Sequence, residues 1–134
     1  MISADRLGPG RRSGRFRQAL LDHPGAGGVF LRRPVVSPSI ARVTELLFEL
    51  VGEGGVAGDA AAEAVDAFVL VTMGSITNDL SRPADVRERL LDHLPPGETP
   101  LMVEQIDTYA HRDGEARYRV ALEWMLDGVE RAAR

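Results

Sequence analysis

The sequence predicts an all-α fold, a helical bundle of about six to seven helices. Apolar residues recur at intervals of three and four along its ordered segments, and no run alternates apolar and polar residues as a strand does. Ser37-Pro38 and Thr99-Pro100 each combine a capping side chain with a proline at the first helical position. The final segment, from Glu115 to Ala133, is apolar at helical spacing on two separate faces. All three observations favour helices.

The first part of the chain predicts two short helices and one longer one. The short helices cover residues 15–23 and 25–33 and end at Pro24 and Pro34. The longer helix starts at Ser37-Pro38 and ends at Gly52, Gly54 and Gly55. The side chains expected to face inward on it are Ile40, Val43, Leu46, Leu47, Leu50 and Val51.

The central segment predicts a long helix that Asp59 caps and that runs to about Leu80. Because it is uncharged from Ala67 to Asn78, we expect it to be buried on every side. Its bulky face, expected against the domain's own core, comprises Val65, Phe68, Val69, Thr72, Met73 and Ile76. Its small face, expected against a partner helix, comprises Ala60, Ala64, Ala67, Val71, Gly74 and Asn78.

Three further helices follow. A short one begins at Pro83 and ends before Pro95-Pro96, a second begins at Thr99-Pro100, and Asp113-Gly114 forms the turn into the last. The broad apolar stripe of the last helix comprises Tyr118, Ala121, Leu122, Met125, Leu126, Val129 and Ala132. Val120 and Trp124 lie on its opposite side. That second apolar face meets either a partner or another part of the same chain.

Length and composition indicate one globular domain. Of the 134 residues, 44% are hydrophobic, and we expect a flexible basic leader over residues 1–14 and a helical domain over 15–134. The leader is open to two interpretations, phosphate contact or simple solvation. The absence of cysteine favours a cytoplasmic location. The apolar stretch from Ala67 to Asn78 spans 12 residues, which is too short to cross a bilayer.

No catalytic constellation emerges. His23, His93 and His111 lie far apart and lack the spacing of metal ligands on one helical face. The segment from Gly52 to Ala57 matches a dinucleotide-binding pattern but follows a helix instead of a strand, and Ser75 lacks a nucleophile elbow. The sequence therefore predicts neither an enzyme nor a cofactor or metal site.

The order of several segments resembles the C-terminal regulatory domain of TetR-type transcriptional repressors, over roughly residues 15–130. The resemblance rests on Leu20-Leu21-Asp22-His23-Pro24, Arg32-Arg33-Pro34, the amphipathic helix ending at Gly54-Gly55, the helix around Ala64 to Phe68 with Gly74, and the segment from Tyr118 to Gly128. The family's N-terminal helix-turn-helix has no counterpart here. We therefore expect this chain to reach DNA only through such a module and not by itself.

The resemblance implies the effector-binding and dimerisation domain of a bacterial repressor that responds to a small hydrophobic or amphipathic ligand. It implies a homodimer formed by a four-helix bundle, with Ala67, Val71, Gly74, Val120, Trp124 and Val129 at the interface. It also implies a pocket, bordered in part by the segment from Thr99 to His111, for which the candidates are Phe30, Leu47, Phe68, Thr72, Met102 and Tyr109. The alternative is a free-standing helical dimer that acts as a protein-interaction partner without ligand or DNA.

Overall fold

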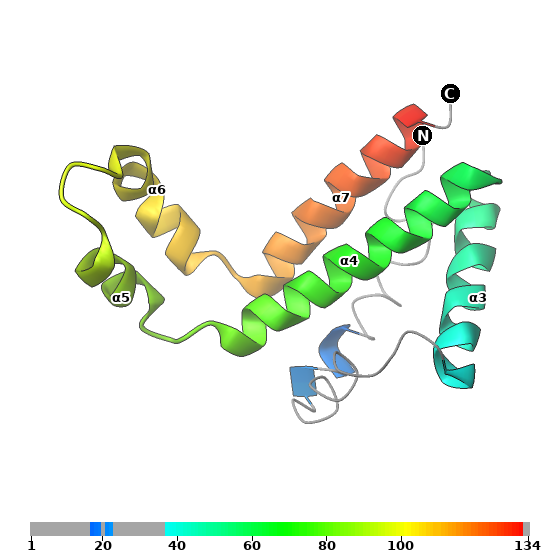
Figure 1. Cartoon of the computed structure of the whole chain (residues 1–134), viewed down its shortest axis with the longest axis horizontal. Coiled ribbons are helices and arrows are strands. Elements are labelled where there is room, and N and C mark those ends of the chain that lie inside the picture. The colour runs from blue at the N-terminus through cyan, green and yellow to red at the C-terminus, as the bar shows by residue number, and fades with distance from the viewer. Residues whose placement is uncertain (1–16, 20, 23–36, 133–134) are drawn as a thin grey trace.

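A computed structural model of the chain describes residues 17–19, 21, 22 and 37–132. These residues form helices and short connections and contain no strand, which confirms the predicted all-α fold (Figure 1). The helices are α3 (Pro38–Glu53), α4 (Asp59–Ser81), α5 (Val86–His93), α6 (Pro100–His111) and α7 (Gly114–Ala132). Residues 17–19, 21 and 22 are also helical, within the first predicted helix, whereas the predicted helix over 25–33 lies outside the described residues.

Local hydrogen bonds define where two of these helices begin. Ser37 Oγ accepts a hydrogen bond of 3.2 Å from the Ile40 amide at the start of α3, as its position before Pro38 predicts. Asp113 plays the same part for α7, accepting a 2.9 Å hydrogen bond from the Ala116 amide. The prediction that Asp59 caps α4 was wrong. Gly58, with a φ of 62° that favours glycine, is the N-cap, and Asp59 is the first helical residue.

Helix α4 is the centre of the fold. It packs most extensively against α7 and also against α3, while α5 packs against α6 to form a hairpin that projects away from these three helices (Figure 1). The core between α4 and α7 contains Tyr118, Leu122 and Leu126, with Phe68 and Val71 of α4 packed against them. Two helices meeting along such a stripe bury one face of each and leave the opposite faces accessible.

That arrangement corrects the prediction that α4 is buried on every side. Leu70 is 65% exposed in the single chain, and Gly74 and Thr77 are exposed as well. The division into bulky and small faces holds only in part, because Val69 is exposed and Ala64 is buried in the chain's own core. The uncharged character of α4 thus continues beyond the surface that α3 and α7 cover.

Helix α3 also buries less than its pattern predicts. Leu46 is 56% exposed and Val43 is 37% exposed, although both belong to the predicted inward face. Leu47, Leu50 and Val51 are half-buried. Among the described helices α3 packs chiefly against α4, and it buries a narrower stripe than its apolar residues span.

Helix α4 also has the length and composition of a membrane span, with 23 residues and a mean hydropathy of 1.4 in its most apolar window. Core helices of soluble proteins meet the same criterion. The uncharged stretch of 12 residues from Ala67 to Asn78 lies within this helix, and Asp66 and Asp79 flank it.

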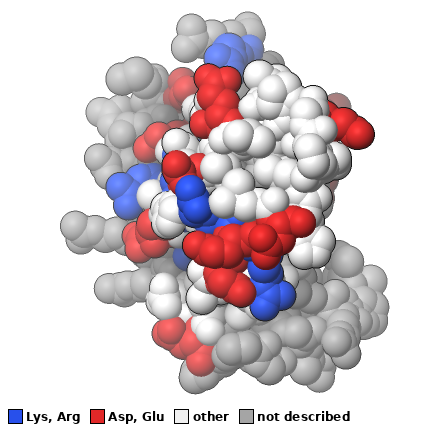
Figure 2. Space-filling view, turned by 90° about the vertical axis from the view of Figure 1, so that its left-hand side faces the viewer, with Lys and Arg blue, Asp and Glu red and all other residues white. Residues whose placement is uncertain are grey.

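Ionic contacts hold the α5–α6 hairpin together. Viewed from the end that carries α5 and α6, acidic and basic side chains gather in the middle of the surface beside an uncharged area (Figure 2). Arg87 of α5 pairs with Asp107 of α6 at 2.6 Å. Arg82, just before the hairpin, donates hydrogen bonds of 2.6 and 3.2 Å to the carbonyl oxygens of Tyr109 and Ala110. These contacts fix the end of α6 beside the end of α4.

Candidate functional site

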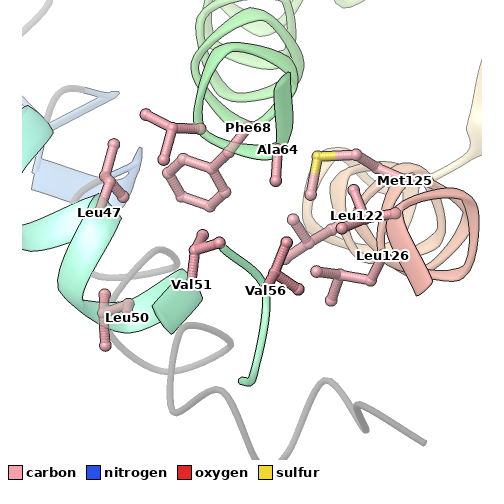
Figure 3. Close-up of a pocket in the computed structure, with 11 residues that line it drawn as sticks. Leu47, Leu50, Val51, Val56, Ala64, Phe68, Leu122, Met125 and Leu126 are labelled. Atoms are coloured by element: carbon pink, nitrogen blue, oxygen red, sulfur yellow. The ribbon is translucent and has the colours of Figure 1, made fainter. Parts of the chain in front are cut away.

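An apolar cavity of about 40 Å³ lies between α3, α4 and α7 (Figure 3). The described side chains that line it are all hydrocarbons, apart from one thioether. They are Leu47, Leu50 and Val51 of α3, Val56 of the following loop, Ala64, Val65 and Phe68 of α4, and Leu122, Met125, Leu126 and Val129 of α7. The walls from α4, α7 and the loop are largely buried, whereas those from α3 are half-buried. The cavity is therefore part of the helix packing, with α3 as its most accessible wall.

A buried pair of hydroxyl groups lies in the same α4–α7 interface. Thr72 Oγ1 and Tyr118 OH are 3.0 Å apart and hydrogen-bonded, and Thr72 is only 1% exposed. Neither residue lines the cavity. Because each hydroxyl has the other as a hydrogen-bond partner, neither is left without one inside the core.

A shallow groove of about 230 Å³ lies on the outer side of the α4–α7 pair. It is lined mostly by small residues: Ala60, Glu63, Ala67, Met125, Gly128 and Val129. Met125 and Val129 line both this groove and the internal cavity. Their side chains are therefore a shared wall between an internal space and an accessible helix face.

A charged cluster joins Arg17, the first described residue, to the end of α4 and the start of α7. The Asp79 carboxylate accepts hydrogen bonds from Arg17 and, at 2.7 Å, from Arg117 of α7. Arg17 also donates a 2.8 Å bond to Ser75 Oγ, and its guanidinium lies 5.4 Å from the centre of the Tyr118 ring. The Arg17 side chain is 4% exposed and that of Asp79 16%, so this cluster fastens the N-terminal helical residues to α4 and α7.

Among the described residues no group of three His, Asp or Glu side chains is placed to hold a metal ion. His93 and His111, which the sequence already placed far apart, each contact a backbone carbonyl one turn earlier on their own helix.

Comparison with known protein families decides the relationship of this chain. Residues 10–133 match the family described as tetracyclin repressor-like, C-terminal domain. The chain belongs to this family. Neither the search of curated proteins nor that of solved structures gave a match. The family assignment confirms the resemblance to the C-terminal domain of TetR-type regulators and agrees with the helical fold.

Of the six residues predicted to line the pocket of this TetR-type domain, only some lie at the cavity. Leu47 and Phe68 line the cavity, and Thr72 is buried close by without lining it. Met102 and Tyr109 lie on α6, outside the cavity, and Tyr109 is 52% exposed beneath the Arg82 guanidinium. Phe30 lies outside the described residues. The cavity is thus bordered by α7, whereas the expected pocket was bordered by the segment that forms α6.

The six predicted interface residues all retain accessible surface in the single domain. Ala67 and Val129 line the outer groove, and Val71 and Val120 are half-buried. Gly74 is exposed, and Trp124 is 71% exposed. Trp is rarely so accessible on a helix without a partner, because its ring carries a large apolar area.

Two features of the site were missed in the sequence. Val56 follows a glycine-rich helix end, which was interpreted only as a linker, yet it is 4% exposed and closes the cavity. The Arg17–Asp79–Arg117 cluster was also missed, although Asp79 is the first charge after the uncharged stretch of α4. An apolar residue in a glycine-rich loop and a charge ending an apolar run were the available signals.

Proposed function

We propose that this chain is the effector-binding and dimerisation domain of a cytoplasmic transcriptional repressor, and that a small hydrophobic ligand controls it. The observation that carries this proposal is the wall formed by Met125 and Val129, which separates the apolar cavity from the outer groove of α4 and α7. A ligand that moves this wall changes the helix face on which a second subunit packs. Family membership supplies the context, since the family is that of tetracyclin repressor-like domains.

The exposed face of α4 and α7 supports a homodimer. On α4, Leu70, Gly74 and Thr77 are exposed and uncharged, and on α7 Trp124 is the most exposed large apolar residue. Small residues such as Ala67 and Gly128 border the groove between the two helices and allow a partner helix to approach closely. In this dimer two copies of α4 and α7 form a four-helix bundle.

Ligand control requires that the ligand bind one arrangement of the helices better than another. Helix α3 is the wall best able to move, because it packs chiefly on α4 and its cavity-lining residues are half-buried. Displacement of α3 or reorientation of Met125 enlarges the cavity. In the assembled regulator this change shifts the two DNA-reading modules relative to each other.

The proposal is tested first by sedimentation velocity of the intact chain over a micromolar concentration series. We expect a dimer, and we expect Trp124→Ala to raise the dimer dissociation constant by roughly 10- to 100-fold, as loss of a buried aromatic anchor does. Leu101→Ala is the matched control, because Leu101 is 74% exposed on α6, away from this face. A chain that stays monomeric throughout the series contradicts the proposal.

A further inference from the structure

Among the described residues, the walls of the cavity offer no polar side chain to a ligand. Its eleven lining residues carry no oxygen, no nitrogen and no charge in their side chains. A hydroxyl, carboxylate or ammonium group placed there gives up its hydrogen bonds to water and gains none in return. The chemistry of the walls therefore selects against every ligand that buries a polar group in this space.

The nearest polar side chains in the core do not change that conclusion. Thr72 and Tyr118 are bonded to each other at 3.0 Å and are both buried. Neither residue lines the cavity, so the pair does not present a polar group on its walls.

The size and burial of the cavity indicate a small molecule and not a segment of protein. Val56, Ala64, Val65 and Leu122 are each 4% exposed or less, so the space lies beneath the surface of the helix packing. An α-helix with its side chains is about 10 Å wide and does not fit between such walls. The space of about 40 Å³ is smaller than the roughly 150 Å³ cavity that holds a benzene ring, so a single ring enters only once the flexible Met125 side chain turns or α3 moves outward.

We propose that this cavity binds a compact uncharged hydrocarbon ring, held by apolar contact alone and without a hydrogen-bond anchor. This inference rests on the proposed effector-binding function and names the chemical class of its ligand. Binding of this kind buries apolar surface and has a negative heat-capacity change. Discrimination comes from exclusion: ligands of the same size that carry a polar or charged group are rejected.

Four ligands that share one aromatic ring provide the test: toluene, phenol, benzoate and benzylammonium. Each is titrated into the intact chain by isothermal calorimetry at neutral pH. Toluene is expected to bind with one site per chain, phenol about tenfold more weakly. Benzoate and benzylammonium, which are charged at this pH, are expected to bind at least roughly 100-fold more weakly than toluene.

A pair of variants locates the site. Ala64→Leu fills the cavity from α4 and is expected to weaken toluene binding at least roughly tenfold, by occupying its volume. Ala62→Leu makes the same chemical change two residues away, at an exposed position outside the cavity, and is expected to leave binding unchanged. If Ala64→Leu fails to fold, Leu47→Phe fills the space from the half-buried α3 wall instead.

Several outcomes overturn this inference. Benzoate or benzylammonium that binds as tightly as toluene contradicts the absence of a polar anchor. Toluene binding that survives both filling variants places the ring elsewhere, and failure of all four ligands to bind the folded chain rejects the ligand class. None of these results tests dimer formation. Dimer formation is tested separately, by sedimentation of the unliganded chain.

Discussion

The carboxylate of Asp79 on α4 accepts a 2.7 Å hydrogen bond from Arg117 on α7. The same carboxylate also pairs with Arg17, so that one negative charge serves two guanidinium groups. This carboxylate thus contacts both α7 and the N-terminal helical residues. The stability of the domain should therefore respond sharply to changes at Asp79.

We expect Asp79→Asn to lower the free energy of unfolding by roughly 2–3 kcal/mol. The variant keeps the shape of the side chain but leaves the buried Arg17 guanidinium without a counter-charge. The expected loss in the free energy of unfolding is smaller than that for a fully buried ion pair, because Asp79 is 16% exposed. Urea denaturation measures the change. Asp85→Asn is the control, since it breaks an ion pair with Arg89 in which both partners are exposed, and equal losses for the two variants would count against the prediction.

Gly114→Ala is expected to destabilise the domain through the same cluster. A Cβ at residue 114 would lie 2.8 Å from Cγ of Asp79, so the carboxylate must shift away from its two guanidinium partners. Gly52→Ala is the matched control: a Cβ there meets nothing within 4 Å. Because alanine is the better helix former, the control should stabilise by about 0.5–1 kcal/mol. The thermal unfolding temperature should fall for Gly114→Ala and rise for Gly52→Ala. A change in the same direction for both variants would contradict the prediction.

The Thr72–Tyr118 hydrogen bond predicts a non-additive pair of variants. Thr72→Val and Tyr118→Phe each strand one buried hydroxyl and should each cost about 1–3 kcal/mol. In the double variant no hydroxyl is stranded, so its cost should fall well below the sum of the two. A double-mutant cycle by chemical denaturation measures the coupling. Additive costs would mean that the two hydroxyl groups do not satisfy each other.

The α5–α6 hairpin should loosen in acid. The hydrogen bond from Arg87 holds the pKa of Asp107 below its ordinary value of 3.8. The ion pair therefore stabilises the hairpin fully above pH 3.8 and loses this contribution as the pH falls through the lowered pKa. Hydrogen exchange of α5 and α6 amides, corrected for intrinsic rates, should rise in this range. Asp107→Asn should show faster exchange at neutral pH and a smaller acid response, and because the pair is exposed both effects should be small.

The starts of α3 and α7 could be predicted from sequence because the deciding contacts lie within three residues. Ser37 accepts a hydrogen bond from the Ile40 amide, and Asp113 accepts one from the Ala116 amide. Both motifs can be recognised within a few consecutive residues of the sequence. The same holds for the end of α3, where Gly54 closes the helix and Gly55 follows with a φ of 83°. The helical periods of α4 and α7 likewise predicted Phe68, Tyr118 and Leu122 in the core, but they placed Val71, which also packs there, on the face of a partner helix.

The depth of burial was not predictable in the same way. Leu46 follows the apolar period of α3 yet is exposed, and Ala64 belongs to the small face of α4 yet is buried. Periodicity gives the direction in which a side chain points along its own helix. It does not give the position or number of the helices that cover that direction.

By itself, then, the sequence determined the all-α class, several of the helix ends and part of the apolar faces, since these follow from contacts within a few residues. Only the tertiary structure decided which distant groups meet: Thr72 and Tyr118 are 46 positions apart, and Arg17 and Asp79 are 62 apart. The cavity belongs to the second group as well. It is the space that remains when α3, α4 and α7 pack imperfectly, and such a remainder depends on the relative placement of three helices, which no local pattern encodes.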